Sequence, residues 1–111
     1  MNNLFDIACN FSSDRFDNDL NEVIQRAKNN NVTKFLVVSA SLKDAEKVNK
    51  IYQDNKDSCF FTIGVHPHNA NEFGSFSSAE MIKLIEKYKP HSVGETGLDF
   101  FRNISSYEEQ L

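Results

Sequence analysis

Apolar and polar residues change their spacing at regular intervals along this chain, and each change predicts a new secondary-structure element. Residues 4–10 alternate between apolar and polar side chains, which is typical of a strand with two different faces. Residues 34–40 and 59–65 are almost continuously apolar, as in parallel strands that are buried on both faces. Residues 92–95 add a shorter run, so the pattern predicts four strands.

Helical spacing of apolar residues occupies the intervals between these strands. It predicts a first helix over residues 18–29. The asparagines at positions 29–31 predict its end, because asparagine tolerates the left-handed conformation. Ser41, followed three residues later by Asp44, predicts the capped start of a second helix. Each predicted strand is therefore followed by a predicted helix of ordinary length.

The third and fourth helices complete the alternation. Ser77 and Glu80 predict a capping box at the start of the third helix, and residues 105–111 resemble the first turn of another. Strands that alternate with helices imply a parallel sheet with right-handed crossovers. Two α/β architectures fit this order, an open doubly wound sheet or part of a TIM (β/α)8 barrel. In both, ligands bind at the carboxyl ends of the strands.

Composition limits the protein class. The chain has 111 residues, a formal net charge of −4 and 40% hydrophobic residues, which predicts one globular unit spanning residues 1–111. It contains no apolar stretch of the roughly 20 residues that cross a bilayer and no signal peptide, so we expect a cytoplasmic protein without membrane contact. Its acidic balance excludes nucleic-acid binding by a broadly basic surface. A phosphate-containing substrate would need a bound cation or a few local basic residues.

A single carboxylate at the end of the fourth predicted strand is the first candidate site residue. Glu95 lies between Gly94 and Gly97, which leave room for a ligand to approach the backbone. A charged carboxylate at the end of a buried strand costs several kcal/mol unless a partner compensates it. Two interpretations remain open, a metal ligand or a structural salt bridge to Arg102.

Two histidines follow the third predicted strand. Pro67 stands between His66 and His68 and favours an extended conformation for His66. Imidazole binds divalent transition metals and transfers protons near neutral pH. A pair of histidines at one strand end, beside a glutamate from the next strand, favours a functional site over solvent-exposed side chains.

Further polar residues give weaker signals. Asp99 and Arg102 are expected to orient the glutamate loop or contact substrate, or else to form an ordinary exposed pair. Alternation along the first strand predicts two faces. One carries Phe5, Ile7 and Cys9, and the other carries Asp6, Ala8 and Asn10, of which Asp6 and Asn10 would point toward the site if that face lines a barrel.

Three motifs together resemble a known family. The stretches FDIACNF, TIGVHPH and VGETGLDFFRN, with EEQ after them, resemble the TatD family of metal-dependent deoxyribonucleases over essentially the whole chain. That family is similar in fold to the amidohydrolases, a TIM barrel with divalent metals at its C-terminal mouth. The resemblance implies that Glu95 is a metal ligand, that His66 is needed for activity, and that the cofactor is a divalent cation such as Mg, Mn or Zn.

The chain departs from the family pattern in two ways. Many members have an H-x-H pair where this sequence has Ala8 and Asn10, a replacement similar to that of the TatD-proper branch. A TIM barrel needs roughly 250 residues, so this chain resembles the N-terminal half, with about four of the eight β/α units. The remaining metal ligands would lie beyond Leu111. We therefore expect the chain alone to be inactive, and to self-associate or dissolve poorly through uncovered sheet edges.

The resemblance predicts that the complete protein hydrolyses phosphodiester bonds in DNA, from the 3′ end, with no stable protein partner. Two alternatives remain. The same metal site would also suit hydrolysis of a small amide or ester. The second alternative is a non-enzymatic α/β domain that binds a phosphate ligand or a protein.

Overall fold

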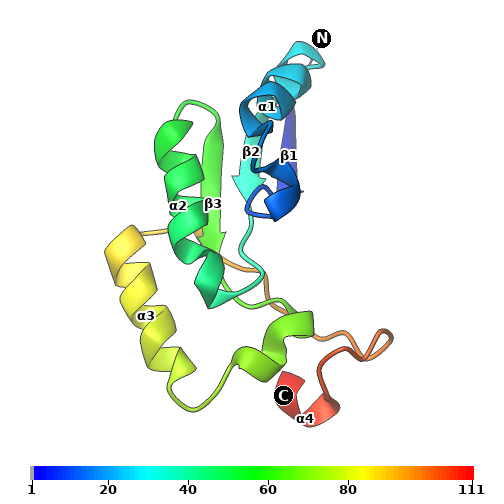
Figure 1. Cartoon of the computed structure of the whole chain (residues 1–111), viewed down its shortest axis with the longest axis vertical. Coiled ribbons are helices and arrows are strands. Elements are labelled where there is room, and N and C mark those ends of the chain that lie inside the picture. Colours follow the sequence, from blue (N-terminus) through cyan, green and yellow to red (C-terminus); the bar gives the residue numbers. More distant parts are fainter. Residues whose placement is uncertain (1) are drawn as a thin grey trace.

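Four strands form one parallel sheet in the computed structural model, which describes residues 2–111. Their order across the sheet is β1-β2-β3-β4, so each strand lies beside the next one in sequence. Figure 1 shows β1, β2 and β3 side by side. Consecutive units of a barrel have this strand order, whereas in a doubly wound sheet the strand order reverses part-way across the sheet. The strands are β1 (Leu4–Cys9), β2 (Val32–Val37), β3 (Cys59–Ile63) and β4 (Ser92–Val93).

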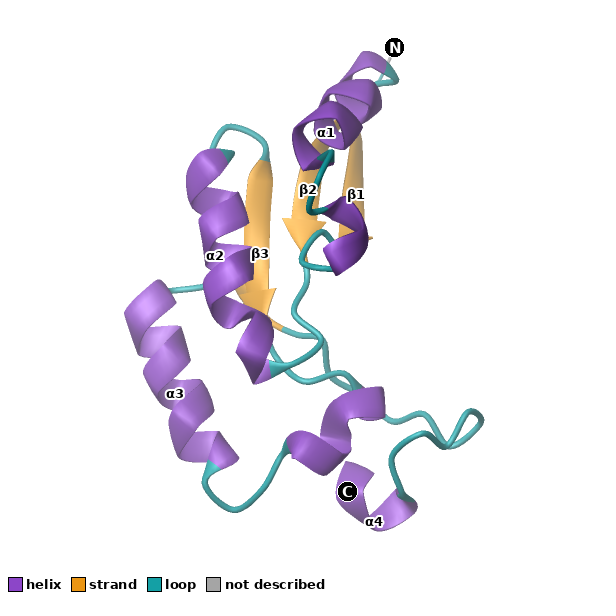
Figure 2. Ribbon diagram, viewed as in Figure 1, coloured by secondary structure: helices purple, strands orange, loops and turns teal. Residues whose placement is uncertain are grey.

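Helices follow each strand. The arrowheads of β2 and β3 point toward the end of the molecule that holds the C-terminus (Figure 2), and β1 runs parallel to β2. No helix within residues 2–111 is long and apolar enough to cross a membrane. The α-helices are α1 (Leu20–Asn29), α2 (Ala45–Asp54), α3 (Ser77–Tyr88) and α4 (Tyr107–Gln110), and three short 3-10 helices are η1 (Asp14–Phe16), η2 (Leu42–Asp44) and η3 (Pro67–Glu72).

Two predicted helix signals are confirmed. Helix α1 ends before Asn31, which adopts a left-handed conformation with φ of 67°. At the start of the second helical segment the Ser41 hydroxyl accepts a hydrogen bond from the Lys43 N–H at 3.2 Å. The Asp44 carboxylate in turn accepts one from the Ser41 N–H at 3.0 Å, which completes the capping box. Local sequence therefore determines both ends correctly.

The predicted capping box of Ser77 and Glu80 is wrong. Helix α3 begins at Ser77 itself, and its N-cap is Phe76, which makes no side-chain capping bond. The Ser77 hydroxyl instead accepts a hydrogen bond from the Gly74 N–H at 2.8 Å. Since the hydroxyl is already used by the preceding loop, it ties that loop to the helix instead of capping the first turn.

The two faces predicted for β1 are also wrong. Phe5 lies against Phe60 with a ring-centroid distance of 5.6 Å, while Cys9 belongs to the buried core together with Phe61. Phe60 and Phe61 are neighbours in a strand and point to opposite faces of the sheet. Phe5 and Cys9 must then face opposite sides as well. The cause is an irregularity in the pairing of β1 with β2 between Asp6 and Cys9, which interrupts the alternation.

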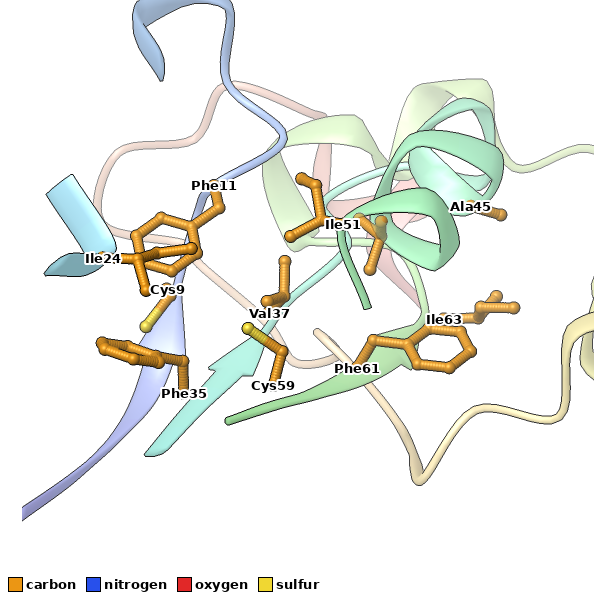
Figure 3. Close-up of a cluster of buried hydrophobic side chains, with 11 residues drawn as sticks. Cys9, Phe11, Ile24, Phe35, Val37, Ala45, Ile51, Cys59, Phe61 and Ile63 are labelled. Atoms are coloured by element: carbon orange, nitrogen blue, oxygen red, sulfur yellow. The ribbon is translucent and has the colours of Figure 1, made fainter. Parts of the chain in front are cut away.

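The core lies between the sheet and its helices, as Figure 3 shows. It combines strand residues such as Phe35 and Ile63 with helix residues such as Ile24 and Val48. Cys9 and Cys59 are free thiols within this cluster, and burial raises the pKa of both above the ordinary value. On the opposite face of the sheet, Phe5 lies against Phe60 and is 49% exposed.

Candidate functional site

Two buried hydroxyl residues hold the carboxyl ends of three strands together. Ser39 follows β2 and Thr62 lies in β3, and both are almost completely buried. The Thr62 hydroxyl accepts a hydrogen bond from the Ser39 N–H at 3.1 Å and donates one to the Gly94 carbonyl at 2.6 Å. The Ser39 hydroxyl donates to the Thr62 carbonyl at 2.7 Å. These bonds replace the regular ladder, so β2 ends at Val37 and β3 at Ile63, earlier than predicted.

Glu95 and His66 start from adjacent points on this end of the sheet. The Glu95 N–H donates to the Ser39 carbonyl at 2.9 Å, and the His66 N–H donates to the Ala40 carbonyl at 2.9 Å. The two predicted catalytic residues therefore share a backbone anchor after β2. Within residues 2–111 their side chains make no direct hydrogen bond or ion pair with each other.

Gly64 allows β3 and the segment after β4 to cross closely. A Cβ atom at this position would lie 2.3 Å from the Gly94 carbonyl carbon and 2.4 Å from the Glu95 oxygen. Gly94 and Gly97 have open space in the same test, although Gly97 has a φ of +145° that favours glycine. The glycine that the site requires sterically is thus Gly64, which the sequence alone did not single out.

The Glu95 carboxylate has no hydrogen-bond or ion-pair partner within residues 2–111. It is half-buried, and in the described part of the chain it accepts no hydrogen bond and forms no ion pair, so the expected salt bridge to Arg102 does not form. Glu95 lines a cavity of about 200 Å³ together with polar and apolar neighbours. The other lining residues are Val65, Pro67, Ala70, Phe73, Met81, Val93, Thr96, Gly97 and Gln110. A carboxylate in this state is available to a ligand.

His66 caps the short helix η3 with its own ring. Its Nδ1 accepts a hydrogen bond from the His68 N–H at 3.1 Å, and the two imidazole rings lie 4.3 Å apart between centroids. Because a neutral imidazole carries one proton, this bond assigns the proton of His66 to Nε2. His66 therefore offers a hydrogen-bond donor, and neither of its nitrogens is a free metal ligand in this tautomer.

The second histidine is joined to Asp99. The His68 Nε2–H donates to Asp99 Oδ2 at 2.8 Å, and the Arg102 backbone N–H donates to Asp99 Oδ1 at 2.9 Å. These two bonds, that of Arg102 first, lower the pKa of Asp99 below its ordinary value of 3.8. Asp99 therefore acts on His68 and on its own loop, whereas the Arg102 side chain is exposed and forms no ion pair within residues 2–111.

Ser105 and Gln110 complete a network that the sequence analysis missed. The Gln110 side chain accepts from the Asp99 N–H at 2.7 Å and donates to the Ser105 carbonyl at 2.8 Å. The Ser105 hydroxyl, on a residue only 1% exposed, donates to the His68 carbonyl at 2.9 Å. Helix α4 and the loop before it are thereby attached to η3. The only signal in the sequence was the EEQ triplet, which by itself does not predict these hydrogen bonds.

We expect this attachment to weaken in acid. Asp99 has a depressed pKa in the folded state, so its contribution is complete above the ordinary value of 3.8 and is lost as the pH falls below it. The protection factors of the amides in residues 105–110, which compare the observed exchange rate with the intrinsic rate at the same pH, should be high at about pH 5 and lower at about pH 3. Asp99→Asn should lower these protection factors already at the higher pH, and Asp54→Asn, which changes an exposed pair, should not. Protection factors that are independent of pH and of the Asp99 substitution would contradict this role.

Asp6 and Asn10 lie apart from these contacts. Asp6 is exposed, and its carboxylate accepts a hydrogen bond from the Ala8 N–H at 3.1 Å. Asn10 is also exposed. Neither side chain is bonded to His66 or Glu95 within the described residues. Their proposed role at the site therefore stays a prediction.

The sequence profile of the family described as TatD related DNase matches residues 5–111. This chain belongs to the TatD-related DNase family. It is 36% identical over 107 residues to the 3′-5′ ssDNA/RNA exonuclease TatD of Pantoea ananatis and 37% identical to the protein of the same name from Cronobacter sakazakii. These alignments cover 96% of the chain but only 41% and 40% of the relatives.

Solved structures agree with this assignment. A TatD-family hydrolase from Entamoeba histolytica superposes with a TM-score of 0.84 at 30% identity, covering 99% of this chain and 43% of that one. An uncharacterized amidohydrolase from Saccharomyces cerevisiae superposes with a TM-score of 0.82 at 26% identity, covering 99% and 41%. The four β/α units thus form a half-barrel of the TatD and amidohydrolase type, which confirms the predicted fold class.

Among the described residues, the Glu95 carboxylate is a suitable donor for the metal ion that the TatD family uses. Residues 2–111 contain no group of three or more His, Cys, Asp or Glu side chains arranged to hold a metal ion. The unpaired Glu95 carboxylate nevertheless has the oxygen donor and the open space that a divalent cation requires. Glu95 is therefore the candidate metal ligand among the described residues.

Proposed function

We propose that this chain forms the N-terminal part of a metal-dependent 3′-5′ exonuclease that hydrolyses phosphodiester bonds in DNA. The observation that carries the proposal is the half-buried Glu95 carboxylate, which follows a barrel strand and has no partner among the residues that the structure describes. An unpaired carboxylate in such a position is costly unless a cation compensates it. The names of the bacterial relatives, which act on single-stranded DNA and RNA, support the substrate class.

Glu95 would hold a divalent cation, and such an ion would neutralise charge on the scissile phosphate and activate water. The remaining ligands would come from the part of the barrel that this chain does not span. Glu95 would present one carboxylate oxygen to the cation. The hydrogen bond from the Glu95 backbone N–H to the Ser39 carbonyl fixes the backbone that carries this side chain.

His66 would bind the substrate rather than the metal. Its proton lies on Nε2, because Nδ1 accepts a hydrogen bond from the His68 N–H, and this Nε2–H has no acceptor within residues 2–111. A phosphate oxygen is a strong acceptor for such a donor. The bond between His68 and Asp99 limits movement of the loop that carries His66, so we propose that these two residues position it.

A completed barrel tests this function. It consists of this chain joined to the part of the Pantoea ananatis relative that the alignment does not cover. We expect it to shorten single-stranded DNA from the 3′ end when a divalent cation is present, and to stop when the cation is chelated. The same sample assayed on small esters and amides tests the alternative chemistry.

A folded completed barrel that cleaves small esters and leaves DNA intact would contradict the proposed substrate. DNA cleavage unaffected by chelation would contradict the metal dependence. Circular dichroism and size-exclusion chromatography of each sample establish that it is folded before activity is compared.

A further inference from the structure

One buried hydroxyl joins the carboxyl ends of three strands. Thr62 lies in β3 and is 2% exposed. Its hydroxyl accepts a hydrogen bond from the N–H of Ser39, after β2, at 3.1 Å. It donates its single proton to the carbonyl of Gly94, after β4, at 2.6 Å. Because β3 has a strand partner on each side, residues of this chain alone bury the Thr62 hydroxyl.

The peptide group between Gly94 and Glu95 is held at both of its polar atoms. Its carbonyl oxygen accepts from the Thr62 hydroxyl, and its N–H donates to the Ser39 carbonyl at 2.9 Å. The Ser39 hydroxyl donates in turn to the Thr62 carbonyl at 2.7 Å, which closes a ring of hydrogen bonds. Breaking this ring would leave buried polar groups unsatisfied. The backbone immediately before the Glu95 side chain is therefore fixed by Thr62 and Ser39.

The Glu95 side chain has no comparable support of its own. Carboxylates that bind metal ions are normally oriented by hydrogen bonds from neighbouring groups. The Glu95 carboxylate accepts none within residues 2–111, so its direction depends on the backbone from which it starts. We propose that Thr62 is a positioning residue, whose hydroxyl sets the direction in which the Glu95 carboxylate meets a divalent cation. This role rests on the proposed function, because it requires Glu95 to bind a metal ion.

The zinc affinity of the completed barrel tests this role. Thr62→Val removes the hydroxyl and keeps the branched shape of the side chain, whereas Thr62→Ser keeps the hydroxyl. In competition with a chromogenic zinc chelator, Thr62→Val should raise the Zn²⁺ dissociation constant at least about tenfold, and Thr62→Ser should keep it within about threefold of the parent barrel. A folded Thr62→Val protein with the zinc affinity of the parent would overturn the proposal.

Ser58→Ala is the matched control for the loss of a buried hydroxyl. Ser58 precedes β3 and is 2% exposed, and its hydroxyl donates to Asp57 Oδ1 at 3.3 Å. Removing either hydroxyl should lower Tm, because each is buried and hydrogen-bonded. Only Thr62→Val should change the Zn²⁺ dissociation constant. If Ser58→Ala raised that constant as much as Thr62→Val does, the effect of Thr62 would be one of general stability and the proposal would be overturned.

Amide exchange of the parent barrel gives an answer that needs neither a metal ion nor a folded variant. The Glu95 N–H should have a protection factor comparable to that of the Gly94 N–H, which donates to the Ile63 carbonyl at 3.0 Å. A Glu95 amide that exchanges at its intrinsic rate would show that the ring is open in solution. That result would overturn the positioning role whatever the protein hydrolyses.

Glu95→Gln separates failure of this role from failure of the proposed function. It should raise the Zn²⁺ dissociation constant at least as much as Thr62→Val does. Loss of zinc affinity in Glu95→Gln, with full affinity in Thr62→Val, would overturn the positioning role alone. Full affinity in Glu95→Gln would overturn the proposed function together with the role of Thr62.

Discussion

Replacing Glu95 with glutamine in the completed barrel is expected to lower kcat/KM for single-stranded DNA at least about 100-fold, which corresponds to several kcal/mol of lost metal-dependent stabilisation. Glutamine keeps the size of the side chain and removes its negative charge. Because Glu95 makes no side-chain hydrogen bond or ion pair in the described chain, the free energy of unfolding should not fall by more than about 0.5 kcal/mol. The expected result is a folded and inactive protein.

Glu86→Gln is the matched control for this substitution. Glu86 is an exposed residue of α3, outside the cavity that Glu95 lines. Its substitution removes the same charge and should leave both kcat/KM and stability unchanged. Activity of the Glu95 variant equal to that of the control would reject Glu95 as a metal ligand. Loss of activity accompanied by unfolding would assign Glu95 a structural role instead.

Gly64→Ala is expected to cause the largest loss of stability. The added methyl group would overlap three backbone atoms of Gly94 and Glu95 at 2.3 to 2.4 Å, and backbone atoms cannot move aside as a flexible side chain can. We expect the free energy of unfolding to fall by about 3 kcal/mol or more. In thermal denaturation this corresponds to a decrease in Tm of at least about 10 °C.

Gly74→Ala separates this steric effect from the general effect of losing a glycine. A Cβ atom at Gly74 would meet no atom within 4 Å, and its φ is not in the left-handed range. Its Tm should therefore stay within a few degrees of the parent chain. If Gly64→Ala were equally mild, the close crossing of β3 and the segment after β4 would not exist in solution.

Periodicity predicted the fold because burial on one side of each element controls it. The predicted β/α order is confirmed, since α1, α2 and α3 each present an apolar stripe to the sheet. Errors arose where a tertiary contact overrides a local signal. The irregular pairing after Asp6 reverses the face of Cys9, and the Gly74 N–H occupies the hydroxyl of Ser77. Neither partner can be inferred from the neighbouring residues.

The candidate site was predictable in position but not in detail. Carboxyl ends of parallel strands share one edge, so Glu95 and His66 were expected there and start there. The tautomer of His66 and the role of Asp99 depend on hydrogen bonds formed in the folded chain. Gly64 was missed because its constraint comes from the backbone of Gly94 and Glu95, about 30 residues away in sequence. Ser39 and Thr62 left a signal, since they are hydroxyl residues inside apolar runs.

The most direct test of the account is the location of a metal ion relative to Glu95. Crystals of the completed barrel soaked with Zn²⁺ and measured at the zinc absorption edge would reveal bound ions by anomalous scattering. We expect an anomalous zinc peak with a Glu95 carboxylate oxygen about 2.0 to 2.2 Å away. Zinc peaks only at other places, with the Glu95 carboxylate paired to a protein side chain, would contradict it.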